Sequence, residues 1–310
     1  MKPVPRRYRR NRSPRAGFTL VELLIVISII GLLAALSVGA AVTLMGVQKK
    51  NNSKLVIEKT ADALDQQWKA QVDQAKNESI SAGELNLAGN DPRRARVIHI
   101  YLRLRQEFPE TYAEAVSSLT IPGYPAMQPK NAYVKALGSR SGNASTESAA
   151  CLLLALSQPR RGMGFKADIA LGSGAVQDTD CDGINEIVDG WQRPIGFWRW
   201  PTQNNELSNT LSANPLDPEG TLMAPSWNNA NNSTSVLTFE ALCGGNYAIH
   251  TGSGATWAPA PQLAKTRPVI GSAGPDGLWG VGWGDMLSDG TGNDYDNLYS
   301  YRLSLGGKGD

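Results

Sequence analysis

The sequence has few of the side chains used for imidazole catalysis, zinc binding or disulfide frameworks. Its 310 residues include two histidines, His99 and His250, and three cysteines. Three cysteines cannot form a framework of paired bridges, and two histidines leave little for a zinc site. A Gly-Lys-Ser/Thr phosphate loop is also missing, and no histidine is suitably spaced from a nucleophile motif. These absences disfavour an enzyme.

Acidic residues are absent from the first 17 positions, which hold seven of the 30 Lys and Arg residues. The rest of the chain holds 23 basic against 28 acidic residues, so the formal charge of +2 becomes −5 without this segment. We therefore expect no nucleic-acid partner, because little basic surface remains to neutralise phosphates. With 41% hydrophobic and 19% charged residues, the chain is neither a disordered tail nor a polytopic membrane protein.

The longest uncharged stretch runs from residue 23 to residue 47. About 25 residues form a helix of roughly 37 Å, which is long enough to cross a bilayer. An ordinary secretory signal is the alternative, but the run is long for one and no small-residue cleavage site stands out at its end. The basic segment before it predicts a cytoplasmic N-terminus, with everything after Gln48 outside.

A carboxylate, Glu22, stands at the head of this apolar run. Insertion into hydrocarbon costs such a group about 2.5–3.5 kcal/mol, and acids placed there are usually functional. The alternative is an interfacial glutamate hydrated among lipid headgroups.

The residues around Glu22, Arg-Ala-Gly-Phe-Thr-Leu-Val-Glu-Leu-Leu-Ile-Val-Ile at 15–27, resemble the class III signal of type IV pilins and type II secretion pseudopilins. The resemblance implies that a prepilin peptidase cleaves after Gly17 and methylates the new amine of Phe18. It also implies that Glu22 pairs with the terminal amine of a neighbouring pilin or pseudopilin subunit. Assembly would take place at an inner-membrane platform, with the globular part in the periplasm.

Elementary electrostatics agrees with this role for Phe18 and Glu22. Cleavage would leave an ammonium group and a carboxylate four residues apart at the start of an apolar helix. A pair formed between subunits would offset both desolvation penalties and set the axial stagger. The helix also carries small residues that permit close helix packing, namely Gly31, Ala34, Ala35, Gly39 and Ala40.

The helix is expected to continue beyond the membrane as an amphipathic segment to about Ala82. Apolar residues recur there at spacings of three and four: Ile57, Ala61, Leu64, Trp68, Val72 and Ala75. The predicted organisation is a cleaved leader (1–17), a transmembrane and assembly helix (18–47), its amphipathic continuation (48–82) and a globular domain (83–310).

The sequence of the globular part predicts an α+β, pilin-like fold with a small antiparallel sheet, extra helices and long loops. One helix is expected over Pro92–Leu119, with arginines that either pair with nearby acids or lie in solvent, a basic binding face being the alternative. Another is expected over Ser145–Gln158, capped by Ser145. Residues Trp191–Trp200 are expected to form a half-buried pair of strands around a turn. Further strand candidates are Val236–His250 and Pro268–Ala273, and a loop is expected over Pro201–Ser235. The aromatic residues of Trp191–Trp200 are either core or a strip that stacks on sugars.

A first acidic segment has the spacing of an EF-hand calcium loop. Oxygen-bearing side chains fall at positions 1, 3, 5, 9 and 12, which are Asp178, Asp180, Asp182, Glu186 and Asp189. Gly183 falls at position 6, and Ile184 at position 7 offers a backbone carbonyl. The departure is Asp189, where the usual residue is a bidentate glutamate. A metal-free acidic turn is the alternative.

A second acidic segment follows Gly274-Pro-Asp-Gly, and this C-terminal region resembles that of major pseudopilins. The resemblance implies calcium ligands at Asp276, Asp294 and Asp296, whereas a polar Gly-rich loop is the alternative. One disulfide among Cys151, Cys181 and Cys243 is also open, without a choice of pair.

Taken together, these patterns predict a structural subunit of a pilus-like fibre, most specifically a type II secretion pseudopilin with calcium in its loops. The alternative is a membrane-anchored binding protein or adhesin that does not polymerise. A metal-dependent anchored hydrolase ranks third.

Overall fold

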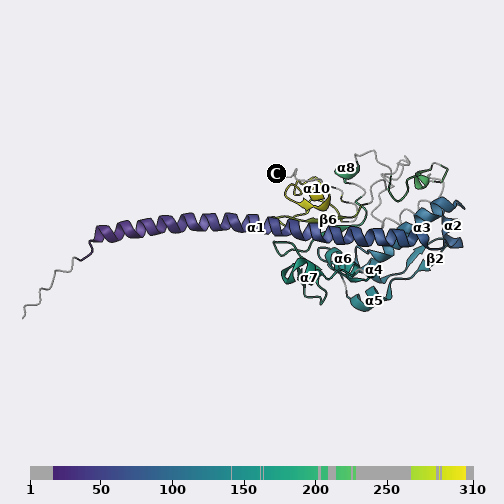
Figure 1. Ribbon diagram of the computed structural model, residues 1–310, viewed down its shortest axis with the longest axis horizontal. Helices are drawn as coiled ribbons and strands as arrows, with labels where there is room; N and C mark the ends of the chain where they lie inside the picture. Colours follow the sequence, from purple (N-terminus) through teal and green to yellow (C-terminus); the bar gives the residue numbers. More distant parts are fainter. Residues whose placement is uncertain are drawn as a thin grey trace, which may run out of the picture. The chain divides into compact units, whose positions relative to one another are not determined.

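The computed structural model describes residues 17–140, 142–160, 162, 164–201, 204–208, 214–224, 226–227, 267–283, 286 and 288–304. The chain divides into two compact units, Met1–Val47 and Gln48–Asp310. Helix α1, Leu20–Asn77, begins in the first unit and ends in the second (Figure 1). The expected long N-terminal helix is therefore confirmed.

Helix α1 ends at Asn77, five residues before the predicted end at Ala82, because Ser81 starts a separate helix, α2 (Ala82–Leu87). The Ser81 hydroxyl accepts a hydrogen bond from the Glu84 amide at 3.2 Å, and the Glu84 carboxylate accepts one from the Ser81 amide at 2.6 Å. This reciprocal capping box satisfies the first amides of α2 and breaks the continuity with α1.

The single helix expected over residues 92–119 is two helices, α3 (Pro92–Glu107) and α4 (Tyr112–Val116). Pro109 lies between them. Proline lacks an amide donor and disfavours helical geometry in the residue before it, so the helix ends there. Asp91 caps α3, accepting from the Arg93 amide at 2.9 Å.

The strands are short and antiparallel. One pair joins β1 (Leu119–Ile121) and β2 (Tyr124–Met127), a second joins β3 (Val176–Gln177) and β4 (Glu186–Ile187), and a three-stranded sheet has the order β5 (Gly196–Trp198), β6 (Val269–Ser272), β7 (Leu298–Tyr299). The remaining elements are α5 (Asn131–Leu137), α6 (Glu147–Ser157), α7 (Ala167–Leu171), η1 (Ser173–Ala175), α8 (Asn205–Ser208), η2 (Thr221–Met223) and α10 (Ser300–Ser304). This is an α+β fold consistent with the pilin-like architecture.

The strand expected at residues 268–273 is confirmed as β6, but residues 191–200 do not pair with one another around a turn. Only β5 is a strand, and it pairs with β6 in the register Phe197↔Ile270. The candidate at 236–250 lies outside the described residues, as do residues 202–203, 209–213, 225 and 228–235 of the loop expected at 201–235.

The core of the second unit forms on the buried face of α1. The fully or nearly fully buried α1 residues include Ile57, Leu64, Val72 and Ala75, which belong to one cluster with buried residues of α3, α6, β5 and β6. In the view of Figure 1, α4, α5, α6 and α7 lie below this half of α1, and β6 and α10 lie above it. The periodicity of the amphipathic segment therefore identified its core face correctly.

The aromatic strip at residues 197–200 belongs to the core. Trp198 is 0% exposed and Trp200 is 1% exposed. The Trp200 ring lies 4.9 Å from that of Tyr101 on α3 and 5.3 Å from that of Trp68 on α1. Such contacts stabilise a core and leave the Trp198 and Trp200 rings without an open face for a sugar.

The arginines of α3 make contacts within the chain. Arg94 is buried and donates to the carbonyls of Ala88 and Thr221 at 2.7 and 2.9 Å. Arg105 pairs with Glu114 at 2.9 Å, and Arg103 pairs with Glu78 at 2.8 Å. Arg93 pairs with Glu219, and Arg96 donates to the backbone carbonyls of residues 75 and 78. The interpretation that these side chains pair internally is confirmed.

Helix α6 begins at Glu147, with Thr146 rather than Ser145 at the N-cap. The Ser145 hydroxyl instead bonds the Asn143 side chain at 3.0 Å, and the Thr146 hydroxyl donates to Asp180 at 2.7 Å. The prediction that Ser145 caps this helix was therefore wrong. The helix starts one residue later than predicted, and Thr146 at its start is held by Asp180, which is distant in sequence.

Candidate functional site

The residues of the class III motif stand at the first turn of α1. The Glu22 carboxylate accepts hydrogen bonds from the Thr19 amide at 2.8 Å and the Thr19 hydroxyl at 2.9 Å, and the Glu22 amide donates to that hydroxyl at 3.2 Å. This is a capping box, in which a threonine and the glutamate three residues later satisfy each other's backbone donors. In a single subunit, the Glu22 carboxylate therefore already accepts hydrogen bonds from within its own chain.

Thr19 was not singled out from the sequence, although the signal was readable. A threonine, two residues, a glutamate and then an apolar run form the pattern of a helix N-terminus. Gly17 and Phe18 lie just before this cap and are exposed, Phe18 by 82%. The peptide bond between them is thus outside the helix, where a protease can reach extended backbone.

Beyond Glu22, α1 presents an apolar surface to its surroundings. The described side chains from Phe18 to Val47 are exposed, and this part of α1 is long and apolar enough to cross a membrane, with a mean hydropathy of 2.7. Its hydroxyls are satisfied inside the helix, since Ser28, Ser37 and Thr43 each donate to the carbonyl four residues earlier. Such internal bonding is what a hydrocarbon environment requires.

The small residues of this segment leave open space on the helix surface. A Cβ atom added at Gly31 or Gly39 meets nothing within 4 Å. Another helix can therefore approach the backbone closely at these positions.

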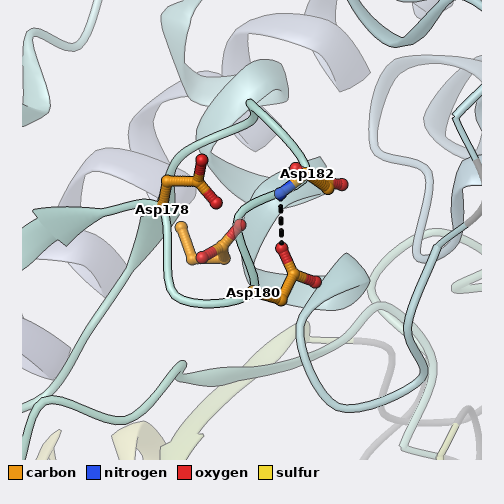
Figure 2. A group of neighbouring side chains, drawn as sticks. Asp178, Asp180 and Asp182 are labelled. Carbon is orange, nitrogen blue, oxygen red and sulfur yellow. Dashed lines mark hydrogen bonds between the residues drawn. The ribbon is translucent and has the colours of Figure 1, made fainter.

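Four of the five acids of the EF-hand-like segment are brought together. One oxygen from each of Asp178, Asp180, Asp182 and Glu186 lies within 4.8 Å of the others. Figure 2 shows the three aspartates around one tight turn of the loop between β3 and β4. The spacing of the acids therefore predicted a real cluster.

Asp189 is not part of this cluster. Its carboxylate accepts hydrogen bonds from the Trp191 and Arg193 amides at 2.8 and 3.0 Å and from the Ser272 hydroxyl at 2.5 Å. Burial raises the pKa of Asp189, and these donors act against that shift. The Asp189 side chain therefore has a structural role, because its hydrogen bonds connect the turn at residues 189–193 to strand β6.

Ile184, predicted to offer its carbonyl at position 7, lies in the cluster loop, where its amide donates to Asp182 at 2.7 Å. Two further contacts hold the loop from outside and had no signal in the sequence. Tyr112 of α4 donates to Asp182 at 3.0 Å, and Thr146 at the start of α6 donates to Asp180. Only the tertiary structure brings these segments together.

The C-terminal acids form no comparable group within the described residues. Desolvation raises the pKa of Asp296, and the charge of Asp276 raises it further. Asp294 lies in the segment that packs against Gly280. Among the described residues, the three ligands that the resemblance implied, Asp276, Asp294 and Asp296, do not form a group of acids at metal-binding distance.

The cysteines do not pair within the described residues. Cys151 is buried in α6 and Cys181 is exposed in the acidic loop, and both are free thiols. Cys243 lies outside the described residues, as does His250.

Comparison with known families gives a match at the N-terminus. Residues 12–38 match the family model described as the prokaryotic N-terminal methylation motif. The matched span includes the Gly17–Phe18 bond, the Thr19–Glu22 capping box and the first part of the apolar helix. Comparison with curated proteins and with solved structures gave no match.

Proposed function

We propose that this chain, whose N-terminal motif and apolar helix fit the type IV pilin and pseudopilin family, is a structural subunit of a pilus-like fibre. The observation that carries the proposal is the methylation motif at residues 12–38, placed directly on an apolar helix whose side chains are all exposed up to Val47. A soluble monomer would not keep so large an apolar surface, whereas lipid and neighbouring helices both cover it.

In this function the chain is first a membrane protein with a cytoplasmic N-terminus and a periplasmic globular unit. Prepilin peptidase cleaves the Gly17–Phe18 bond and the amine of Phe18 is methylated. The ammonium group of one subunit then meets the Glu22 carboxylate of another. Because Glu22 is already held by Thr19, its carboxylate is oriented before the neighbour arrives, which lowers the entropy cost of pairing.

Within this class we favour a type II secretion pseudopilin, on the likeness of the C-terminal region to major pseudopilins. The length of 310 residues also suits a minor or tip subunit. The anchored adhesin is less well supported, because Trp198 and Trp200, two of the aromatic residues in the Trp191–Trp200 strip that would hold a ligand, are buried.

The processing step is tested by mass spectrometry of the mature protein from its own membrane. We expect an N-terminus at methylated Phe18. An intact Met1, or a cut beyond Val38, would contradict the assembly role.

The assembly step is tested with Glu22→Gln, which keeps an acceptor oxygen for the cap but removes the charge. We expect loss of filaments, scored by electron microscopy of sheared material, with normal membrane levels of the subunit. Glu58→Gln is the matched control, since Glu58 is an exposed acid further along the same helix. Normal filaments from Glu22→Gln would show that assembly does not depend on the Glu22 charge, whereas a native chain that never forms filaments would argue for the anchored binding protein.

A further inference from the structure

The loop between β3 and β4 holds four carboxylates in a fixed arrangement. The strands close the loop through the register Val176↔Ile187 and Gln177↔Glu186. Inside it, the amides of Asp182, Gly183 and Ile184 donate to the side chains of Asp180, Asp178 and Asp182 at 3.3, 3.0 and 2.7 Å. These bonds turn the side chains inward (Figure 2).

Two residues in this loop adopt left-handed backbone conformations. Gly183 has φ +85° and Cys181 has φ +62°. Glycine tolerates this region without strain, whereas other residues do so at a cost. The tight curvature at Gly183 is what returns the chain toward Glu186.

Glu186 provides an observation that is independent of the clustering. Its side chain is 0% exposed, and its Oε2 atom accepts from the Thr179 amide and hydroxyl at 2.7 and 2.8 Å. Its Oε1 atom is buried and has no hydrogen-bond partner in the described part of the chain. A buried carboxylate oxygen without a partner is costly, so something is expected to bind it.

The four carboxylates concentrate negative charge in one loop. Within the described residues, no Lys or Arg forms an ion pair with any of the four carboxylates. The nearby Arg140 donates to the backbone carbonyl of Asp182 at 2.8 Å rather than to a carboxylate. Four acids within 4.8 Å of one another repel unless they bind a cation or are protonated.

We propose that Asp178, Asp180, Asp182 and Glu186 bind one calcium ion in the β3–β4 loop. The donors are all carboxylate oxygens, which hard divalent cations prefer. The four donor oxygens lie within 4.8 Å of one another, which is compatible with a calcium ion, whose ligands on opposite sides are about 4.6–5.2 Å apart. Magnesium demands a stricter octahedron and keeps several of its waters, so we expect it to bind this set of carboxylates less well than calcium. The site is separate from the C-terminal segment and does not depend on filament assembly.

Calcium at this position would connect three segments of the globular unit. Asp180 bonds Thr146 at the start of α6, and Asp182 bonds Tyr112 of α4. A cation that fixes both aspartates therefore also fixes the loop against these two helices. We expect calcium to stabilise the whole unit rather than the loop alone.

The test uses the full mature chain, purified in detergent and stripped with EGTA. Thermal unfolding is followed in EGTA, 1 mM CaCl2 or 1 mM MgCl2, and calcium is titrated by calorimetry. We expect calcium to raise the Tm by about 5 °C or more, and magnesium to raise it far less. Glu186→Gln should lose one equivalent of bound calcium and the associated rise in Tm.

Glu186→Gln also distinguishes two roles for Glu186, that of a metal ligand and that of an acid needed only for the fold. Glutamine can still accept from Thr179 while its amide group faces the aspartates. In EGTA the variant should therefore be as stable as the native chain or more stable, because one buried charge is gone. A lower Tm in EGTA together with an unchanged calcium response would overturn the proposal.

Two further variants control for charge and for the other acidic segment. Asp168→Asn removes an exposed acid on α7 and should leave calcium binding intact. Asp276→Asn should still bind the equivalent of calcium that Glu186→Gln loses. Should calcium fail to bind the native chain, or bind only through Asp276, the proposed site does not exist.

Discussion

The amide of Gly190 donates a hydrogen bond to the Ser53 hydroxyl at 2.8 Å, so the turn before β5 rests directly on the backbone of α1. A Cβ atom at Gly190 would lie 2.1 Å from the carbonyl oxygen of Lys49 and 3.0 Å from the Ser53 hydroxyl oxygen. No side chain fits this contact. Glycine is required here for close approach between two backbones rather than for an unusual φ.

Gly190→Ala should therefore separate the turn from α1 or distort it. Overpacking of this kind costs about 1–3 kcal/mol, which corresponds to a Tm lowered by several degrees. Thermal unfolding of the full chain in detergent measures this. Gly174→Ala is the control, since a Cβ atom there meets nothing within 4 Å; equal stability of the two variants would show that the turn does not rest on α1.

Ser148→Ala should uncouple α6 from β5. The buried Ser148 hydroxyl donates to the Phe197 carbonyl at 2.9 Å and accepts from the Phe197 amide at the same distance. Its removal leaves two backbone groups unsatisfied, at a cost of about 1–3 kcal/mol. Urea unfolding measures the loss of stability. Ser157→Ala, which removes an exposed hydroxyl bonded only within α6, should be close to neutral.

Glu84 should make the stability of the globular unit fall in acid. Burial opposes its ionisation, but hydrogen bonds from His99 and Ser81 outweigh burial and lower the pKa of Glu84 to about 2. Because the folded pKa is below the unfolded value of 4.5, its contribution is complete above about pH 4.5 and is lost as the pH falls toward 2.

Glu84→Gln isolates this effect. At pH 7 the variant should be less stable by an amount on the order of 2–3 kcal/mol, and the difference should close between pH 4.5 and pH 2. Urea midpoints at several pH values measure the difference. Asp168→Asn should keep a constant difference from the native chain, and a similarly constant difference for Glu84→Gln would exclude the stabilised carboxylate.

Thr19→Ala should weaken the first turn of α1 without preventing assembly. Loss of the capping hydroxyl costs about 1 kcal/mol locally. The Glu22 charge remains available to a neighbouring subunit, so filament yield should stay near normal. A complete loss of filaments from Thr19→Ala, matching that from Glu22→Gln, would mean that the cap rather than the charge is what assembly needs.

The sequence by itself determined the elements whose causes are local. The apolar run of α1, its amphipathic continuation with Ile57 and Leu64, the strand at Val269–Ser272 and the acidic cluster depend on composition, period or spacing within a short window. The interactions that create these features lie within a few residues of one another, so a pattern is enough to predict them.

The tertiary structure decided what depends on distant partners. Asp189 was grouped with the metal ligands by spacing, yet Ser272 draws its carboxylate to β6. Thr146 rather than Ser145 stands at the N-cap of α6 and binds Asp180, and β5 pairs with β6 rather than with its own flank. A carboxylate or a strand edge bonds whichever donor the fold brings within 3 Å, and spacing along the chain does not contain that information.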